Sequence, residues 1–307
     1  MRDAFVRALM REAKNNPRLV LITGDLGFGV LKPFWEQFPS QFINAGIAEQ
    51  SMVSMAAGLA RTGRTVLVYS IGNFPTLRCL EQIRNDCCYH EADVKIVCVG
   101  GGLVYGSLGM SHHATEDMAV MRALPGMRVF TPGDPVEVEA VVPEMLRTPG
   151  TCYLRLGRGG EKCVHESPIP DYHAPQALVL REGTDTALIS GGGILTQTWE
   201  AAAILEKAGV SCGVVSLPCL KPLDTDTLMT MARRLRHIFT VEEHTVIGGV
   251  GGAVCEAVAE CGIPVQVHRI GMPDTYATLV GTQAYLRAQY GVSAERIAQR
   301  VMQTLHG

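Results

Sequence analysis

Short apolar runs alternate with helix-like segments along the first half of the chain. The runs are rich in Val, Ile and Leu and end in turn residues, as buried β-strands do, at 19–23, 65–69, 94–99, 128–131 and 152–156. Apolar spacing or small, helix-forming residues predict helices between them, at 2–15, 50–61, 77–88, 116–124 and 135–146. Continuous apolar strands that alternate with helices indicate a parallel sheet covered on both faces.

A second unit of the same kind follows a polar stretch. Residues 159–175 are polar and rich in proline, with neither a helical nor a strand period, and are the best candidate linker. Beyond them we predict strands at 186–190, 212–216, 237–240 and 264–269, with helices at 195–208, 224–235, 251–260 and from 294 onward. The sequence therefore predicts two doubly wound α/β domains with parallel sheets: residues 1–165, a linker at 166–178, and residues 179–307.

Composition narrows the class of protein. The chain has 307 residues, of which 47% are hydrophobic and 19% charged, so it can bury a large core. Its formal net charge of −3 offers no electrostatic footprint for nucleic acid or for an acidic membrane. No uncharged stretch is apolar enough to cross a bilayer, and the first sixteen residues lack the apolar centre of a signal peptide.

The ten cysteines fit a reducing compartment. Several lie inside apolar runs, and none forms the Cys-x-x-Cys pair of a zinc or redox site. We interpret them as small buried hydrophobic residues and expect the protein to be cytoplasmic.

The first segment with chemical content is Asn44-Ala-Gly-Ile-Ala-Glu49-Gln. It leads into a helix so rich in Ala, Gly, Ser and Met that it must pack closely. A carboxylate at this point is either a first-turn acid that complements the helix dipole, or a buried acid that bonds a nitrogen of a ligand. These residues alone favour the first interpretation.

A loop broken by glycines carries two adjacent histidines, His112 and His113. Adjacent side chains point in different directions, so at most one of the two is expected to face a site. His112 and Glu116 could share a metal ion, but no third ligand has a suitable spacing, and we predict no metal site in this chain. A pair of surface histidines is the alternative.

Arg158 ends a strand among glycines, in the run Leu156-Gly-Arg-Gly-Gly. The planar fork of an arginine there suits a phosphate or carboxylate, although an exposed arginine at the end of a strand needs no ligand. The glycine groups at 191–193 and 248–252 complete no dinucleotide-binding motif, and close approach of helix and strand accounts for them.

In combination these segments resemble the C-terminal part of transketolases, namely a pyrimidine-binding domain followed by the transketolase C-terminal domain. Gly46-Ile-Ala-Glu49-Gln resembles the motif of deoxyxylulose-phosphate synthases and their relatives, and Ser111-His112-His113 falls where transketolases carry Thr-His-Gln. The runs that begin at Glu116, Phe130 and Val241 match family segments in the same order. The occurrence of all these segments in the family's order is far more specific for transketolases than any one segment.

The resemblance implies a thiamine-diphosphate enzyme that moves a two-carbon ketol unit from a ketose to an aldehyde. It implies that Glu49 bonds N1′ of the cofactor's aminopyrimidine, and hence that this carboxyl is shielded from water and has a raised pKa. Phe74 is the expected stacking residue, although the family's first aromatic position falls on Gly72. The resemblance places Ile47, Tyr69 and Arg78 beside the same ring, and His112 beside the substrate's oxygens.

Two departures from the family bear on the substrate. The acid that transketolases use to contact a sugar hydroxyl is Leu108 here, and the serine that helps to hold the sugar phosphate, shortly after Asp25, is Gly29. Arg158 does stand where the family keeps a phosphate arginine. The sequence therefore predicts a modified sugar rather than a standard pentose phosphate, with Asp25 still at the substrate.

A family motif is missing as well. Thiamine enzymes hold the diphosphate and its metal with Gly-Asp-Gly followed by Asn, but the Gly-Asp pairs at Asp25 and Asp134 lack both partners. We therefore expect an N-terminal, diphosphate-binding transketolase subunit to hold Mg²⁺ or Ca²⁺, in an α2β2 heterotetramer.

Two other functions stay open on the sequence. The beta subunit of a 2-oxo acid dehydrogenase has the same two domains, but the Ser-His-His and Glu-Glu-His segments favour a transketolase. A non-catalytic regulatory subunit is the other alternative. Leu108 and Gly29 allow it, and Glu49 and His112 argue against it.

Overall fold

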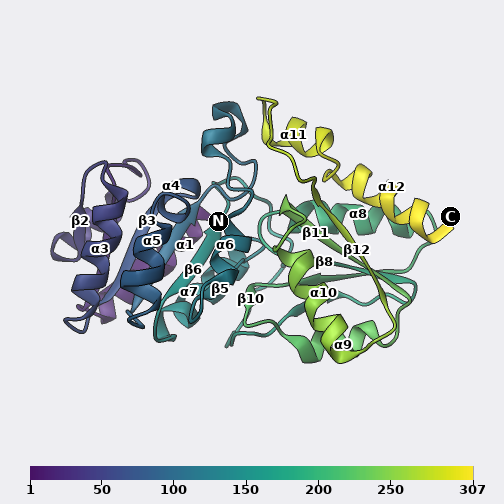
Figure 1. The fold of residues 1–307 in the computed structure, drawn as a ribbon, viewed down its shortest axis with the longest axis horizontal. Helices are drawn as coiled ribbons and strands as arrows, with labels where there is room; N and C mark the ends of the chain where they lie inside the picture. Colours follow the sequence, from purple (N-terminus) through teal and green to yellow (C-terminus); the bar gives the residue numbers. More distant parts are fainter. Residues whose placement is uncertain (307) are drawn as a thin grey trace.

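The computed structural model describes residues 1–306 and contains two sheets with helices on both faces. Figure 1 shows two lobes side by side, with the N-terminal domain at the left and the C-terminal domain at the right. The predicted α/β class with doubly wound, mainly parallel sheets is confirmed. No helix within residues 1–306 has the length and apolar character needed to cross a membrane.

The first sheet has seven strands in the order β10-β5-β6-β4-β3-β1-β2. Adjacent strands of this sheet pair in parallel, except that β10 runs antiparallel to β5. The strands are β1 (Leu19–Thr23), β2 (Phe42–Asn44), β3 (Thr65–Ile71), β4 (Val94–Val99), β5 (Arg128–Phe130), β6 (Cys152–Leu156) and β10 (Cys219–Lys221).

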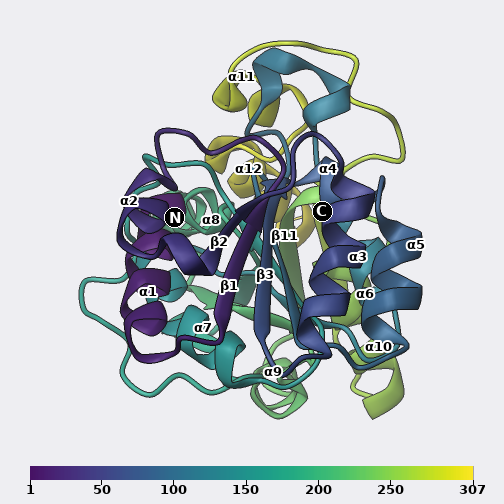
Figure 2. The ribbon, with the colours of Figure 1, turned by 90° about the vertical axis from the view of Figure 1, so that its left-hand side faces the viewer.

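Successive residues of these strands pack toward opposite faces of the sheet. Leu19 and Leu21 belong to a hydrophobic cluster with α1 and α7, whereas Val20 and Ile22 belong to a cluster with α3 and α6. Figure 2 shows these two helical layers on either side of the strands. The helices of this domain are α1 (Arg2–Asn15), α2 (Lys32–Gln37), α3 (Glu49–Ala60), α4 (Asn73–Thr76), α5 (Leu80–Gln82), α6 (Asp117–Ala123) and α7 (Pro135–Arg147).

The second sheet has five strands in the order β12-β11-β8-β9-β7. One face is covered by α8 and α12 and the other by α9 and α10. Its strands are β7 (Leu178–Arg181), β8 (Thr186–Ser190), β9 (Cys212–Ser216), β11 (His237–Thr245) and β12 (Gln266–Met272). The helices are α8 (Leu195–Lys207), α9 (Thr225–Ala232), α10 (Val250–Cys261), α11 (Gln283–Gln289) and α12 (Ala294–His306).

Polar caps fix where several helices begin. Asp134 accepts hydrogen bonds from two backbone N–H groups in the first turn of α7, and Asp224 and Thr282 each accept one such bond at the start of α9 and α11. Helix α10 ends at Cys261 and is followed by Gly262, whose φ of +63° is a left-handed conformation that glycine adopts without strain.

The structure corrects one predicted helix. Residues 77–88 form no single helix: α4 begins at Asn73, the chain turns near Cys79, and α5 continues into a π-helix at Ile83–Cys88. Pattern reasoning also missed β2, β7, β10, α2 and α11, each of which has seven residues or fewer. Residues 157–177 contain neither helix nor strand, as expected for the polar stretch.

Candidate functional site

The candidate residues gather at the carboxyl edge of the first sheet. Asp25 and Gly29 follow β1, Glu49 follows β2, and Phe74 and Arg78 follow β3. The loop with Leu108 and His112 follows β4, and Arg158 follows β6. Open parallel sheets place their ligands at this edge, because loops from several strands converge there.

Glu49 is the first residue of α3, and only 4% of its surface is exposed. Its Oε2 accepts a hydrogen bond of 2.7 Å from Nη1 of Arg78, while Oε1 accepts no hydrogen bond from residues 1–306. The Arg78 side chain is half exposed whereas Glu49 is buried, so Arg78 is the partner that can turn away into water. One carboxylate oxygen is thus free for a ligand, and Arg78 pairs with the other.

Asn44 fixes the loop that leads to Glu49. Its side-chain oxygen accepts hydrogen bonds from the backbone N–H groups of Asp25 and Gly46, both at 3.0 Å. Its amide donates to the Asp25 carboxylate at 3.1 Å. Asp25 has a φ of +55°, an unusual conformation that these bonds hold. The loops after β1 and β2 are therefore tied together beneath the site.

Ring and guanidinium groups form a continuous row from Glu49 outward. The Arg78 guanidinium lies 4.7 Å from the centroid of the Phe74 ring, and the Phe74 and His112 rings meet edge to face at 5.2 Å. The row continues through Tyr105, 6.4 Å from His112, to Arg158, whose guanidinium lies 5.5 Å from the Tyr105 ring. Pattern reasoning missed Tyr105, because a lone tyrosine in a glycine-rich loop carries no periodic signal.

The two adjacent histidines differ in their surroundings. His112 is partly exposed, its Nδ1 lies 3.1 Å from the Ser111 hydroxyl, and Asn73 donates to the Ser111 carbonyl at 3.1 Å. His113 is buried, neither of its ring nitrogens has a hydrogen-bond partner within residues 1–306, and burial lowers its pKa. Only His112 faces the edge where the other candidates lie.

The remaining candidates fall into two groups. Leu108 and Ile47 expose 54% and 78% of their surface, and a side chain at Gly29 would meet open space. Tyr69 instead belongs to the core: it is 1% exposed, its ring stacks on Phe5 at 5.9 Å, and burial raises its pKa. The structure therefore does not place Tyr69 beside the Phe74 ring, because Tyr69 packs on the α1 face of β3.

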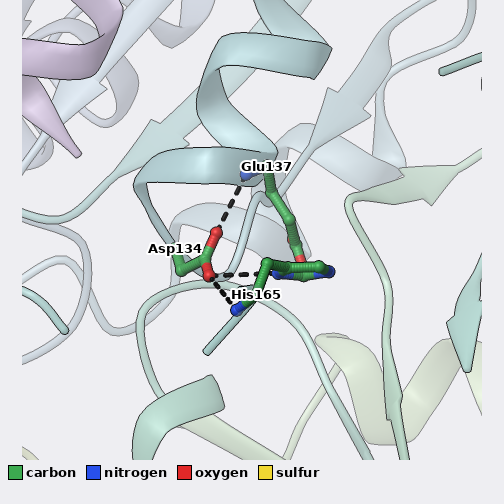
Figure 3. Close-up of side chains that lie close together, drawn as sticks. All are labelled: Asp134, Glu137 and His165. Carbon is green, nitrogen blue, oxygen red and sulfur yellow. Dashed lines mark hydrogen bonds and ion pairs between the residues drawn. The ribbon is translucent and has the colours of Figure 1, made fainter. Parts of the chain in front are cut away.

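A cluster that pattern reasoning missed lies at the start of α7 (Figure 3). Asp134 caps the helix through Oδ1, and its Oδ2 accepts from the backbone N–H groups of Val164 and His165 and lies 3.0 Å from Nδ1 of His165. Because protein N–H groups surround both oxygens of Asp134, the arrangement suits a helix cap that anchors residues 164–165. Loss of such a cap typically costs about 0.5–2 kcal/mol.

Glu137 completes the cluster. It is fully buried, its Oε2 accepts from the Gly133 N–H at 2.6 Å, and its Oε1 lies 3.8 Å from Nε2 of His165. Burial raises the pKa of Glu137 to about 7. Burial also opposes charge on His165, but the hydrogen bond to Asp134 and the nearby carboxylates outweigh it and raise the pKa of that histidine.

Family comparisons agree with this architecture. The family model for the transketolase pyrimidine-binding domain matches residues 1–160, and the model for the transketolase C-terminal domain matches residues 175–297. These matches define the class as an α/β protein built from two transketolase modules. The chain belongs to the transketolase family.

Relatives of similar length are known. The chain is 33% identical to one of the subunits of the apulose-4-phosphate transketolase of Phocaeicola vulgatus, covering 98% of this chain and 96% of the relative. It is 34% identical to a putative transketolase C-terminal section of Methanocaldococcus jannaschii, covering 99% and 96%. A 6-deoxy-6-sulfo-D-fructose transketolase subunit of Clostridium sp. is 31% identical, covering 97% and 92%.

Solved structures share the fold. A split-gene transketolase, described as an inactive beta4 tetramer, superposes with a TM-score of 0.92 at 36% identity and covers 99% of this chain and 98% of its own. Transketolase from Pichia stipitis superposes with a TM-score of 0.83 at 19% identity, and there this chain spans 45% of the longer protein.

Proposed function

We propose that this chain is the subunit of a split, thiamine-diphosphate-dependent transketolase that binds the pyrimidine end of the cofactor. The observation that carries this function is the buried carboxylate of Glu49 with one free oxygen, joined through Arg78 to the Phe74 ring and His112. Relatives that match this chain over more than nine-tenths of their length are themselves named as subunits. The domain division at 1–165 and 179–307 is part of the same proposal.

The residues present fit the aminopyrimidine end of the cofactor. The free Oε1 of Glu49 can bond a ring nitrogen, and Phe74 offers an aromatic face within reach of the same site. When bound, thiamine diphosphate supplies the electron sink that a two-carbon ketol transfer requires. We assign the diphosphate and its Mg²⁺ or Ca²⁺ to the partner subunit, in an α2β2 assembly.

Each residue then has a defined task. Glu49 holds a proton at the pyrimidine nitrogen, and Arg78 pairs with Glu49 before the ligand arrives. His112 donates to or accepts from the substrate's oxygens, supported by Ser111. Arg158, at the outer end of the row, binds an anionic tail, for which its planar fork is well suited.

The substrate we propose is a modified ketose with an anionic tail. The exposed Leu108 puts an apolar side chain where the family has an acid, and Gly29 leaves open space in place of a serine. Two relatives are named for apulose 4-phosphate and for 6-deoxy-6-sulfo-D-fructose, which are unusual sugars with anionic groups. Those names support the class of substrate.

A panel of donors tests this function. The complex with a diphosphate-binding partner should transfer a ketol unit from ketoses that lack or invert the hydroxyl facing Leu108, and it should use xylulose 5-phosphate poorly. Leu108→Asp should shift kcat/KM toward xylulose 5-phosphate, whereas the uncharged Leu108→Asn should not.

Two outcomes would count against this function. If the wild type already prefers xylulose 5-phosphate and Leu108→Asp changes nothing, the substrate is set elsewhere. Turnover of a 2-oxo acid with release of CO₂, and no ketol transfer, would instead assign the chain to the dehydrogenase class.

A further inference from the structure

The side chains of Glu242, Glu243 and His244, at the carboxyl end of β11, contact three different parts of the molecule. Glu242 accepts hydrogen bonds from the N–H groups of Val250 and Gly251, at 2.7 and 2.9 Å, and so caps α10 within its own domain. His244 accepts from the Ala119 N–H of the first domain at 3.3 Å. Glu243, between them, is 2% exposed and contacts the loop that carries His112.

The neck of this loop is closed by backbone hydrogen bonds. Gly102 and Ala114, which form this neck, exchange N–H···O bonds of 2.7 and 3.0 Å. Residues 103–113 are the loop between them, and His112 lies near its end. The Glu243 carboxylate accepts the Leu103 N–H at this neck, at 2.7 Å. Arg155 joins the other side, donating to the carbonyls of Ala114 and Glu243 at 2.9 and 3.0 Å.

The same carboxylate also holds α11 against the loop. Gln283 donates to both oxygens of Glu243, at 2.8 and 3.1 Å, and Arg287 donates to Oε2 at 2.5 Å. Leu286 of α11 packs on Leu103, and Figures 1 and 2 both show α11 beside the loop at the top of the molecule. Glu243 thus ties a strand and a helix of the second domain to a loop of the first.

The backbones of Gly102 and Glu243 lie so close together that no larger side chain fits at the neck of the loop. Gly102 has a φ of +71°, and a Cβ there would lie 2.6 Å from the Glu243 carbonyl oxygen, so only glycine lets the two segments approach this closely. Four hydrogen bonds to one buried carboxylate also mean that its loss leaves the buried Leu103 N–H and the partly buried donors of Gln283 and Arg287 unpaired.

We propose that Glu243 is a positioning residue for the transketolase reaction: it clamps residues 103–113 and thereby sets the place of His112. This inference rests on the proposed function for the role of His112, but the clamp itself is independent of it. The C-terminal domain, which contributes none of the residues in the row from Glu49 to Arg158, acts on catalysis through this carboxylate.

Hydrogen exchange on the full chain tests the clamp without any activity. Glu243→Gln offers one carbonyl oxygen for four hydrogen bonds, so the amides of Leu103 and of the loop should exchange at least about tenfold faster, while those of β1, β3 and α3 keep their wild-type rates. Amide exchange in the loop should be faster in Glu243→Ala than in Glu243→Gln. The matched control is Glu242→Gln, which removes a buried carboxylate one residue away and should leave the loop unchanged. Unchanged loop exchange in both Glu243 variants would overturn the clamp.

Kinetics on the complex with its partner test the link to His112. Glu243→Gln should lower kcat by roughly 10–100-fold, because small displacements of a catalytic group are costly, and should leave the affinity for thiamine diphosphate unchanged. The double variant Glu243→Gln/His112→Ala should be no slower than His112→Ala alone. If the two losses multiply, Glu243 does not act through His112. If loop exchange rises but the wild-type complex transfers no ketol unit, the clamp stands and the proposed function fails.

Discussion

At the scale of single residues, the surroundings of Glu49 bear on two roles that the sequence leaves open. An acid that only complements a helix dipole is normally solvated, whereas Glu49 is 4% exposed and has one oxygen without a partner within residues 1–306. The sequence identified this glutamate through the motif around it. It could not reveal that Arg78, twenty-nine residues further on, pairs with it.

A substitution at Glu49 separates the two roles. Glu49→Gln should leave the fold intact, abolish the circular-dichroism signal of the cofactor bound in the complex and lower turnover by about 10²–10⁴-fold, because a positioned proton partner is lost. Glu295→Gln, at a first-turn acid of α12, is the matched control and should have no effect on turnover. If Glu49→Gln turns over at the wild-type rate, Glu49 acts only as an acid at the helix terminus.

Other site residues show what sequence can and cannot predict. Tyr69 shares the face of β3 with Leu67, and both pack toward α1, so the Tyr69 ring lies in the core. Tyr105 lies between His112 and Arg158 only because the loop after β4 folds back on itself. That fold depends on contacts with the second domain, which no local pattern encodes.

At the scale of elements, long apolar runs were predictable and short irregular pieces were not. The strand Leu19–Thr23 and the helix Arg2–Asn15 were predicted with their observed bounds, because each has a clear period and clear ends. The break near Cys79 was not predicted. It turns Arg78 toward Glu49, and the hydrogen bond between them crosses from α3 to the segment after α4.

The cap at the start of α7 gives a pH-dependent prediction. Burial raises the pKa of Glu137 from its ordinary 4.5 to about 7, so between these values the folded state keeps a proton that the unfolded chain releases. The contribution of Glu137 to the free energy of unfolding must therefore fall as pH rises through this interval.

Glu137→Gln removes that titration but keeps an oxygen for the Gly133 N–H. In urea unfolding, the variant should gain stability relative to the wild type as pH rises from about 4.5 to about 7. The exposed Glu166→Gln should follow the wild type at every pH. Parallel curves for wild type and Glu137→Gln would show that Glu137 titrates normally.

At the scale of the whole molecule, the two domains are interlocked. Strand β10 comes from the second half of the sequence yet completes the first sheet, pairing Cys219 with Phe130. One hydrophobic cluster runs from α3 of the first domain to α10 of the second. Sequence patterns predicted two domains. They did not predict β10, because a strand of three residues is too short to show a period or to indicate which sheet it joins.

The edge of the first sheet also presents apolar side chains to solvent. Ile47, Leu108, Met110 and Val280 are all more than half exposed and lie on loops beside the row of site residues or against them. Apolar groups that gather on a surface are typical of protein–protein interfaces. We expect the diphosphate-binding subunit to cover this edge and to complete the site.

Calorimetric titration of thiamine diphosphate with Mg²⁺ tests this central claim most directly. The chain alone should bind the cofactor feebly, because in the proposed function its own residues reach only the aminopyrimidine end. A mixture with a partner chain that carries the Gly-Asp-Gly…Asn motif should bind it tightly and only when Mg²⁺ is present, since binding to the assembled site adds to the stability of the complex. Tight, Mg²⁺-dependent binding by this chain alone would contradict the account.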